Sequence, residues 1–490
     1  MSERYLIGID IGTTGTKAIL FEENGAPVAH AYRGYTLSTP AVGRSEHDAE
    51  GYVTAVAETV KEVCEGRGIA DKVAAIAFST QGGTLIPVDK DGKPVRPAIV
   101  WNDHRCAAEK EAYLREVGDA ATVYEKTGWK LGTGLPLLTV RHLKDNEPEV
   151  FQKTARFLSV PDFVALCLTG RAAIDLSNAG INQLTDIRKG AYDDTLLSFA
   201  GIGKDMLPEI LPSGEVIAPL SEEGAALLGL SEKTLLVSGA HDQYAVALGT
   251  GASRAGDILI GSGTCWVVTA IGNAPDFESS LAQSVAAAPG LWGSLSSLSS
   301  GGVCLEWLRK NVATADGEDL IDFKTLDTEA AKRQAAFDGL FFFPFSGRYE
   351  AGRFQKASFT GLDLSHDRFH MARAVMEGVV FQILWFMERF KTQPDQKGIT
   401  LAGGASKSAV WTQMLADVSG LPVRTPALPD LACVGAAILA GVGAGLYEDA
   451  RAGYTRFASA EKVIAPNMEA HEKYKAAFAE YKRQANAIAK

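Results

Sequence analysis

Residues 5–21 of the chain read YLIGIDIGTTGTKAILF, two apolar runs on either side of a turn that is rich in Gly and Thr. Apolar runs of this length, punctuated by Gly and Thr, are typical of buried strands and predict a β-hairpin. Gly12 and Gly15 carry no Cβ, so the backbone of the turn can approach a ligand closely. The hairpin is therefore a candidate ligand-binding element.

Polar groups gather at the turn of this hairpin. Thr13, Thr14 and Thr16 add hydroxyl donors, and Lys17 adds a positive charge. Asp10 ends the first strand, where a carboxylate can hold a divalent metal that bridges to phosphate oxygens. These features predict a phosphate-binding turn. The alternative is a tight hairpin with a solvated aspartate.

A second stretch repeats the pattern about half a chain length later. Residues 257–272 read DILIGSGTCWVVTAIG, and their turn consists of Gly261, Ser262, Gly263 and Thr264. Self-similarity over so long a period indicates a duplicated domain rather than a solenoid, whose repeats are roughly 20–50 residues long. The phosphates of a nucleotide would then be held by one turn from each half.

Length and composition indicate a globular protein. The chain has 490 residues, of which 46% are hydrophobic, enough for two or three domains with buried cores. The net charge of −11 argues against a surface for nucleic acid or anionic membrane. An anionic ligand would need local N–H groups, Lys17 and a metal to hold it against that charge.

The six cysteines are widely scattered and form no C-x-x-C pair. Their spacing indicates neither a zinc site nor a disulfide framework, and we expect buried thiols in a reducing compartment, the cytoplasm. Asp10 interrupts the apolar N-terminal stretch, so no signal peptide is expected. The longest apolar runs fall short of the roughly 20 residues that a membrane span needs.

A polar loop is expected after the strand predicted at residues 73–78. Residues 79–84 read STQGGT and include Gln81 and Gly82. Ligands bind at the carboxyl ends of strands in open α/β sheets, which makes this loop a candidate site. The alternative is a plain hairpin turn, and the composition of the loop alone favours that alternative.

A further candidate is the run Trp101-Asn102-Asp103-His104-Arg105 at the end of the strand predicted at residues 98–101. A tryptophan beside Asn and Asp offers an apolar face to a sugar ring and hydrogen-bonding partners to its hydroxyls. The alternative is a helix N-cap at Asn102 or Asp103 with a core tryptophan.

Asp242 is the candidate general base. It follows the predicted strand at 235–237 and opens a helix of small residues, a junction where a carboxylate can be fixed and partly desolvated. The alternative is an N-cap aspartate. The neighbouring His241 is more often a packing residue than a ligand.

A strand at 399–402, a turn at Gly403–Ser408 and a helix at 409–419 form a nucleotide-compatible arrangement, because the glycines let a purine or ribose lie against the backbone. A glycine that ends a helix would look similar from composition.

Further elements are expected from apolar periodicity. Asp48 is expected to cap a helix, and the segment at 106–235 is expected to be mostly helical. The remaining expectations are helices at 301–308, 372–390, 432–445 and from 468 onward, a strand at 341–345 that leads to Ser346-Gly347-Arg348, and a domain boundary near 249–256.

Together these motifs resemble those of the FGGY family of carbohydrate kinases, and within it the xylulokinases most of all. The resemblance runs nearly end to end. It rests on GIDIGTTGTKAIL, SEHDAEGY, RPAIVWNDHR, GAHDQ, GSGT, FPFSGR and LAGGASKSAVWTQMLADVSGLPV, which occur in that order.

The resemblance implies an α/β fold of two actin-like, ribonuclease-H-like domains, residues 1–250 and 251–490, with a nucleotide and sugar cleft between them. It implies ATP and Mg²⁺, a small sugar or polyol as substrate, and often a homodimer. Carried over residue by residue, the first phosphate motif falls on Asp10, Gly12, Thr13, Thr14 and Lys17, and the second on Gly263 and Thr264. The adenosine motif falls on Gly403, Gly404, Ala405 and Ser408, with Gly302 and Glu306 near the nucleotide. The catalytic aspartate is Asp242, Asp10 serves the metal, and the sugar contacts are Gln81, Gly82, Trp101, Asn102, Asp103, Asp242 and Gln243.

One departure concerns the substrate. Xylulokinases typically have a Met-His-Gly run where this chain has Thr80-Gln81-Gly82, so the sugar-binding histidine is absent. D-Xylulose is the first expectation, and ribulose, ribitol, erythritol and glycerol are alternatives. From another class, an actin-like or Hsp70-like ATPase would share the hairpins and act on a protein partner, but it would not need the Trp101–Asp103 cluster.

Overall fold

The computed structural model describes residues 4–314, 319–344, 349–350, 353–354, 356–390, 396–458 and 461–488, and these form two compact units. Unit 1 contains Met1–Ser253, Asn273–Ser294 and Leu428–Ala458, and unit 2 contains the rest. The chain first changes unit within the expected boundary at 249–256. Two later segments nevertheless belong to unit 1, so the chain returns to that unit twice after the expected boundary.

A six-stranded sheet forms the centre of unit 1. The expected hairpin is confirmed as β1 (Tyr5–Ile11) and β2 (Gly15–Glu22), which pair antiparallel, while β5 (Val73–Thr80) and β14 (Leu235–His241) run parallel to β1. Asp10 pairs with Ser79, and both Ile11 and His241 pair with Thr80, so the carboxyl ends of three strands meet at one edge. The strand order is β13 (Val216–Pro219), β14 (Leu235–His241), β5 (Val73–Thr80), β1, β2 and β3 (Pro27–Gly34).

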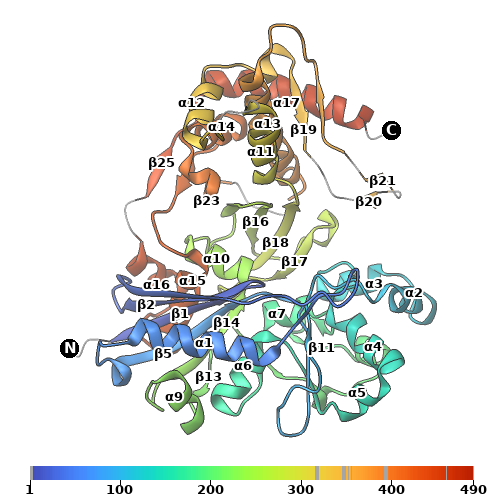
Figure 1. Cartoon of the computed structure of the whole chain (residues 1–490), viewed down its shortest axis with the longest axis vertical. Coiled ribbons are helices and arrows are strands. Elements are labelled where there is room, and N and C mark those ends of the chain that lie inside the picture. Colours follow the sequence, from blue (N-terminus) through green and yellow to red (C-terminus); the bar gives the residue numbers. More distant parts are fainter. Residues whose placement is uncertain are drawn as a thin grey trace. The chain divides into compact units, whose positions relative to one another are not determined.

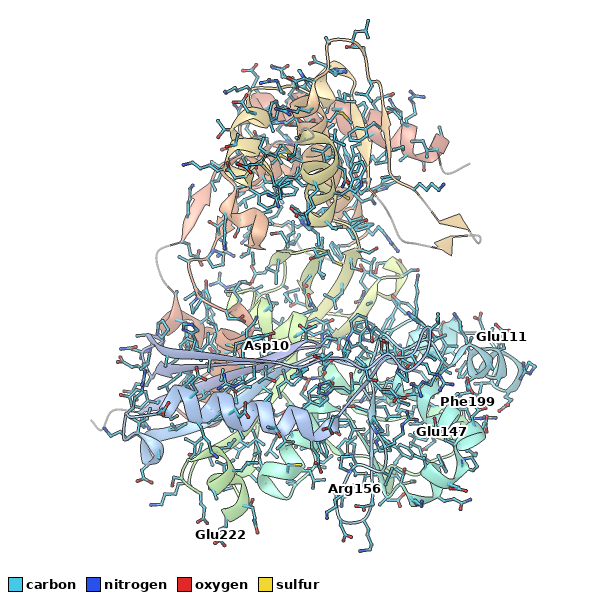
Figure 2. All side chains as sticks on the ribbon, viewed as in Figure 1. Asp10, Glu111, Glu147, Arg156, Phe199 and Glu222 are labelled. Atoms are coloured by element: carbon cyan, nitrogen blue, oxygen red, sulfur yellow. The ribbon has the colours of Figure 1, made fainter. Side chains whose placement is uncertain are left out.

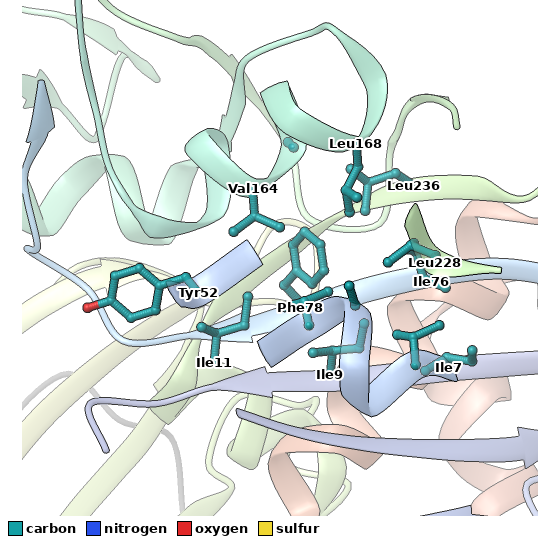
Figure 3. Packing of buried hydrophobic residues seen from close by; sticks show 14 of the residues in the cluster. Ile7, Ile9, Ile11, Tyr52, Ile76, Phe78, Val164, Leu168, Leu228 and Leu236 are labelled. Carbon is teal, nitrogen blue, oxygen red and sulfur yellow. The ribbon is translucent and has the colours of Figure 1, made fainter. Parts of the chain in front are cut away.

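One face of this sheet packs against a buried core. Helix α1 (Ala49–Cys64) lies along the sheet (Figure 1), and the expected cap is confirmed because the Asp48 carboxylate accepts from the amide of Glu50. Isoleucines of β1 pack with Phe78 of β5 and with apolar residues of α6 (Val160–Thr169) and α9 (Glu222–Leu228) (Figure 3). Burial of these side chains fixes the strand edge on which the site is built.

The helix expected at 432–445 is α15 (Leu431–Gly443), which packs across β1, β5 and β14 and against α10 (Asp242–Gly249). A Cβ on Gly8 would lie 1.8 Å from the carbonyl oxygen of Cys433, and one on Gly435 would lie 1.9 Å from that of Ala245. Only glycine fits at these two positions, so the expected close packing of this helix is confirmed.

The segment at 106–235 is mostly helical, as expected, but it also contains short strands. These strands are only two to four residues long, too short for an apolar alternation to predict them. The helices are α2 (Ala107–Glu116), α3 (Ala121–Thr127), α4 (Pro136–Asn146), α5 (Pro148–Lys153), α6, α7 (Leu176–Ile181), α8 (Asp194–Ala200) and α9, and the strands within this segment are β8 (Arg156–Leu158), β9 (Ala173–Asp175), β10 (Thr185–Asp186), β11 (Ala191–Tyr192), β12 (Glu209–Leu211) and β13.

Unit 2 contains a second mixed sheet with helices around it. The second expected hairpin is confirmed as β15 (Ile258–Ser262) and β16 (Trp266–Gly272), and β23 (Ile399–Gly403) runs parallel to β15. Strands β18 (Trp292–Leu298), β16, β15, β23, β24 (Val423–Thr425) and β25 (Lys462–Ile464) lie in that order, and the main helices are α11 (Gly302–Leu308), α12 (Phe323–Ala331), α13 (Arg368–Met387), α14 (Ala409–Ser419) and α17 (Met468–Ile488).

The strand expected at 341–345 is β19 (Phe341–Phe343), while Ser346, Gly347 and Arg348 lie outside the described residues. All six cysteines are free thiols. Within the described chain, no helix combines the length and the apolar character that crossing a membrane would require.

Candidate active site

The turn of the first hairpin, Gly12–Thr14, is held by hydrogen bonds on its carbonyl side. The Gly12 carbonyl oxygen accepts from Nε2 of Gln81 at 3.1 Å and from the hydroxyl of Tyr35, and the Thr14 carbonyl accepts from the Tyr35 amide at 3.1 Å. Within the described residues, the amides of Thr13 and Thr14 have no hydrogen-bond acceptor. Two free N–H groups in a turn can bind an anion such as phosphate.

Asp10 lies at the end of β1 (Figure 2), beside this turn. Its Oδ1 accepts from the Ser79 hydroxyl at 2.8 Å. Burial, followed by the negative charges of Asp430 and Asp242, raises the pKa of Asp10 to about 7. A carboxyl group in such surroundings favours either a proton or a cation.

Lys17 stands directly opposite Asp10 in the β1–β2 register, yet its ammonium pairs with Asp430 at 2.6 Å. Asp430 also caps α15 through the amides of Ala432 and Cys433. The negative charges of Asp430 and Asp242 thus act on Asp10, and the Lys17 ammonium is the positive charge that opposes them. This excess of negative charge and oxygen ligands fits a divalent cation such as Mg²⁺, which Asp10 would hold.

Asp242 is the first residue of α10, directly after β14. The alternative reading as a cap does not describe it, because His241 occupies the N-cap position and makes no side-chain cap bond. The Asp242 side chain is 34% exposed, and its Oδ1 lies 3.4 Å from Nδ1 of His241. A Cβ on Gly239, in the irregular part of β14, would lie 1.8 Å from the carbonyl oxygen of Phe78, so glycine is required for the approach that places Asp242.

Buried polar residues that the sequence did not single out support this junction. The His241 amide donates to Oγ of Ser177 at 2.9 Å, and the Ser177 hydroxyl donates to Asp175. Asn178 bridges Asp175 to Thr80 at the end of β5, with distances of 2.6 and 3.0 Å. The run Asp175-Leu176-Ser177-Asn178 carries a recognisable signal, since aspartate is a preferred N-cap residue and Asp175 caps α7 by accepting from the Asn178 backbone amide.

Gln81 and Gly82 are placed between the two aspartates. Gln81 is only 3% exposed, and its Oε1 accepts from the Thr13 hydroxyl at 3.1 Å. A Cβ on Gly82 would lie 2.6 Å from the His241 ring, so this loop packs closely against the residue before Asp242. Asp10, the first turn, Gln81, Gly82 and Asp242 therefore occupy one edge of the unit 1 sheet.

The three residues at 101–103 differ in how much of each is exposed to solvent. Trp101 is 46% exposed and its indole N–H donates to the Thr13 hydroxyl oxygen at 3.0 Å. Oδ1 of Asn102 is buried and has no hydrogen-bond partner among the described residues. Asp103 is fully buried, and its carboxylate is bound by Arg105 at 2.8–2.9 Å and by the Ser45 amide at 2.7 Å. Asp103 thus organises the loop from inside, whereas Trp101 leaves about half of its surface exposed.

Gln243 follows Asp242 in the first turn of α10 and is partly exposed. It therefore lies next to Asp242 at the start of the same helix.

Unit 2 brings the second turn to the start of α11. The Gly302 amide donates to the Gly263 carbonyl at 3.2 Å, and the Gly301 and Val303 amides donate to the Thr264 carbonyl. A Cβ on Gly302 would lie 2.5 Å from the Gly263 oxygen, which explains the glycine. One turn further along α11, Glu306 pairs with Arg309 at 2.8 Å and Lys310 at 2.9 Å, and the hydrogen bond from Arg309 lowers the Glu306 pKa to about 2.

The predicted adenosine motif adjoins the same hairpin. Gly403 has a φ of +92°, and a Cβ there would lie 2.6 Å from the Ser262 carbonyl oxygen. The Ala405 amide donates to Oγ of Ser262 at 3.0 Å, and Gly404 continues the turn between them. Ser408 caps α14 by accepting from the Trp411 amide at 3.0 Å. Gly263, Thr264, Gly302 and the 403–408 turn therefore form a second group of site residues, within unit 2.

A third cluster, of metal-ligating residue types, was not indicated by sequence spacing. Ligand atoms of Cys106, Glu109 and His142 lie within 4.8 Å of one another in buried surroundings. Nδ1 of His142 lies 2.8 Å from Oε1 of Glu109, so these two groups already form a hydrogen bond with each other.

Comparisons with known proteins match both halves of the chain. The model of the N-terminal domain of the FGGY family of carbohydrate kinases matches residues 5–249, and that of the C-terminal domain matches residues 257–444. A gluconokinase of Bacillus subtilis (strain 168) is 30% identical over 447 residues, 89% of this chain and 86% of the relative. An L-xylulose/3-keto-L-gulonate kinase of Escherichia coli (strain K12) is 29% identical and covers 98% of this chain and 96% of its own length. The crystal structure of a xylulose kinase from Rhodospirillum rubrum matches with a TM-score of 0.90 and 29% identity, over 99% of both chains.

Proposed function

The chain belongs to the FGGY family of carbohydrate kinases, whose fold of two actin-like, ribonuclease-H-like domains it shares, and on that premise we propose that it transfers the terminal phosphoryl group of ATP to a hydroxyl of a small sugar, a ketopentose such as D-xylulose. The observation that carries the proposal is the placement of Asp242 and Asp10 at one edge of the unit 1 sheet, beside a turn with two free amides. The family assignment favours a carbohydrate acceptor over a protein partner.

Asp242 is proposed to accept the proton of the attacking hydroxyl. Its carboxylate is partly exposed, is fixed at a strand-to-helix junction and serves no capping role that would occupy its oxygens. Phosphoryl transfer depends mainly on positioning and on stabilisation of charge, so a fixed carboxylate that orients the hydroxyl and removes its proton fulfils the chemical requirement.

The phosphates are proposed to bind the free amides of Thr13 and Thr14, with Lys17 supplying positive charge. Mg²⁺, when bound with the nucleotide, would neutralise charge on the phosphate oxygens, and Asp10 would hold it. In unit 2, Gly263, Thr264 and Gly302 are proposed to bind phosphate, and the turn at Gly403, Gly404 and Ala405, with Ser408, to bind the adenosine; Glu306 would lie near the nucleotide.

The sugar is proposed to lie against the exposed face of Trp101, with hydroxyls bound by Asn102, Gln243 and Asp242. A tryptophan face covers the apolar side of a sugar, while amide and carboxylate groups bind its polar edge. Gly82 carries no side chain and packs against His241 and Ile181, which places its loop beside Asp242.

The test is a coupled assay for ADP release with and without sugar. We expect release to require a sugar, and Asp242→Asn to lower kcat by about 10²-fold or more, the scale of losing a positioned base. Asp322→Asn is the matched control, because Asp322 caps α12 through the Thr325 amide and has no proposed catalytic role. ADP release that is independent of every sugar tested, or wild-type turnover in Asp242→Asn, would exclude the proposal.

A further inference from the structure

The side-chain amide of Gln81 has all of its hydrogen-bonding groups in use. Nε2 donates to the Gly12 carbonyl at 3.1 Å and to the Tyr52 hydroxyl at 3.2 Å. Oε1 accepts from the Thr13 hydroxyl at 3.1 Å and, more weakly, from the Thr84 hydroxyl at 3.5 Å. With 3% of the residue exposed, no part of the amide remains for a sugar hydroxyl in this conformation.

The Thr13 hydroxyl links this amide to the exposed tryptophan. It accepts the indole N–H of Trp101 at 3.0 Å and donates its own proton to Oε1 of Gln81. The donors and acceptors therefore run in one direction, from Trp101 through Thr13 and Gln81 to the Gly12 carbonyl. In this series of hydrogen bonds, each hydroxyl or amide group is fixed as a donor or an acceptor by its neighbours.

The Gly12 carbonyl is the last acceptor in this series of hydrogen bonds, and its orientation has to be held by its partners. Gly12 has no side chain to restrict its backbone, and its carbonyl orientation sets the direction of the next amide, that of Thr13. Both lone pairs of the Gly12 oxygen are used, one by Gln81 and one by the Tyr35 hydroxyl. Loss of either donor leaves the turn freer to rotate.

We propose that Trp101, Thr13 and Gln81 form a hydrogen-bonded coupling between the sugar surface and the phosphate turn, in which Gln81 is a positioning residue and makes no contact with the sugar. The inference rests on the proposed function. A sugar that lies against Trp101 restricts the indole, the indole N–H restricts Thr13, and Gln81 transmits that restriction to Gly12. Sugar and nucleotide therefore bind with positive coupling through unit 1 alone.

This role explains why an amide and not an imidazole stands at position 81. A neutral imidazole has one donor and one acceptor, whereas Gln81 donates twice and accepts twice. A histidine at this position would leave either the Gly12 carbonyl or the Tyr52 hydroxyl without its partner.

The experiment is isothermal titration of the full-length protein with D-xylulose, with and without a non-hydrolysable ATP analogue and Mg²⁺; L-xylulose or gluconate replaces D-xylulose if turnover ranks it first. The coupling factor is the ratio of the two sugar dissociation constants. For the wild type we expect at least about 5-fold, the lower end of common coupling energies. Trp101→Phe keeps the ring and removes the N–H, and Gln81→Met keeps the volume and removes the amide; each is expected to lower the factor below about 2.

Two further results separate positioning from direct contact. Gln81→Met should change the sugar dissociation constant by less than about 2-fold when nucleotide is absent, since the amide does not touch the sugar. Gln283→Met is the matched control, because Gln283 is a fully buried amide bonded to Asp276 and Ser294 and to no residue of the turn; its coupling factor should equal that of the wild type.

A wild-type factor near 1, an unchanged factor in Trp101→Phe, or weaker sugar binding by Gln81→Met without nucleotide would each overturn the coupling. Trp101→Phe alters an exposed residue, so it remains informative if Gln81→Met does not fold. Failure of the proposed function is distinct, because it shows as the absence of sugar-dependent ADP release in the wild type.

Discussion

The ammonium of Lys17 lies 2.6 Å from Oδ2 of Asp430, a residue more than 400 positions away in the sequence. Asp430 is the N-cap of α15, and α15 is held against β1 by the close approach at Gly8. The only lysine opposite Asp10 in the hairpin is therefore bound elsewhere, and Asp10 is left with the Ser79 hydroxyl as its side-chain partner. This arrangement makes Asp10 the group on which pH and metal should act.

We expect Asp10→Asn to stabilise the metal-free protein at pH 8 and to leave it unchanged near pH 4. The Asp10 pKa is raised to about 7 in the folded protein, mainly by burial and then by Asp430 and Asp242, above its ordinary value of 3.8. The folded state thus holds a proton that the unfolded state releases, so the free energy of unfolding falls as pH rises from about 4 to about 7.

Asparagine removes this pH-dependent penalty, which we put at roughly 1–3 kcal/mol after allowance for solvent screening. Urea denaturation with EDTA at both pH values measures it. A free energy of unfolding for Asp10→Asn that is equal to or below the wild-type value at pH 8 would contradict the electrostatic account.

Magnesium dependence gives a second prediction for the same residue. If Asp10 holds Mg²⁺, Asp10→Asn should raise the Mg²⁺ concentration required for half-maximal turnover by about 10-fold or more, the loss expected when one charged oxygen ligand becomes a neutral one. A Mg²⁺ titration of ADP release at saturating sugar measures this requirement. Asp322→Asn serves as the control here too, and an unchanged titration curve for Asp10→Asn would remove Asp10 from the metal site.

Two glycine-to-alanine variants in the unit 1 sheet test whether the close backbone approach that places Asp242 requires glycine. Gly239→Ala should destabilise unit 1 by about 2 kcal/mol or more, because its Cβ would lie 1.8 Å from the Phe78 carbonyl oxygen. Gly34→Ala is the control, since its Cβ would make an ordinary contact, 3.4 Å from the Tyr32 hydroxyl. Thermal unfolding of both variants measures the difference, and equal melting temperatures would show that β14 shifts at little cost.

Local patterns in the sequence predict the elements that carry the site. The hairpin at 5–21, its counterpart at 257–272 and the helix capped by Asp48 follow from apolar spacing and turn chemistry, and all three occur. The segment after 428 could not be assigned in the same way. Its return to unit 1 depends on packing between α15 and β1, which no local pattern encodes.

For the site residues, too, the local sequence does not predict contacts with distant parts of the chain. Asp103 has the residue type and position of a sugar ligand, but Arg105, two residues later, binds its carboxylate and both are buried. Gln81 is likewise turned inward by partners at Gly12 and Tyr52, which are far from it in the chain. The sequence predicts which residues gather at the strand ends, whereas the partners that determine which side chains remain free are set by tertiary contacts.

The remaining question is which sugar the enzyme phosphorylates, and the charge around Trp101 bears on it. An aldonate such as gluconate carries a carboxylate that needs a cation. The cation nearest in sequence, Arg105, is 2% exposed and is bound by Asp103 at 2.8 Å and Glu46 at 2.7 Å. The exposed face of Trp101 suits a neutral polyhydroxyl ligand better.

We therefore expect D-xylulose to give the highest kcat/KM in an ADP-release screen that includes L-xylulose, 3-keto-L-gulonate, gluconate, ribulose, ribitol, erythritol and glycerol, with Asp242→Asn as the background. A site that pairs with particular hydroxyls rejects analogues that lack them by large factors, because its own polar groups are left unpaired. Gluconate should rank at least 10-fold below D-xylulose, since the Arg105 guanidinium is already paired with Asp103 and Glu46 and does not compensate the charge of its carboxylate. A 10-fold preference for gluconate would contradict the ketopentose proposal and would require a cation other than Arg105 at the sugar surface, while a preference for L-xylulose would change only the configuration that the hydroxyl-binding groups select.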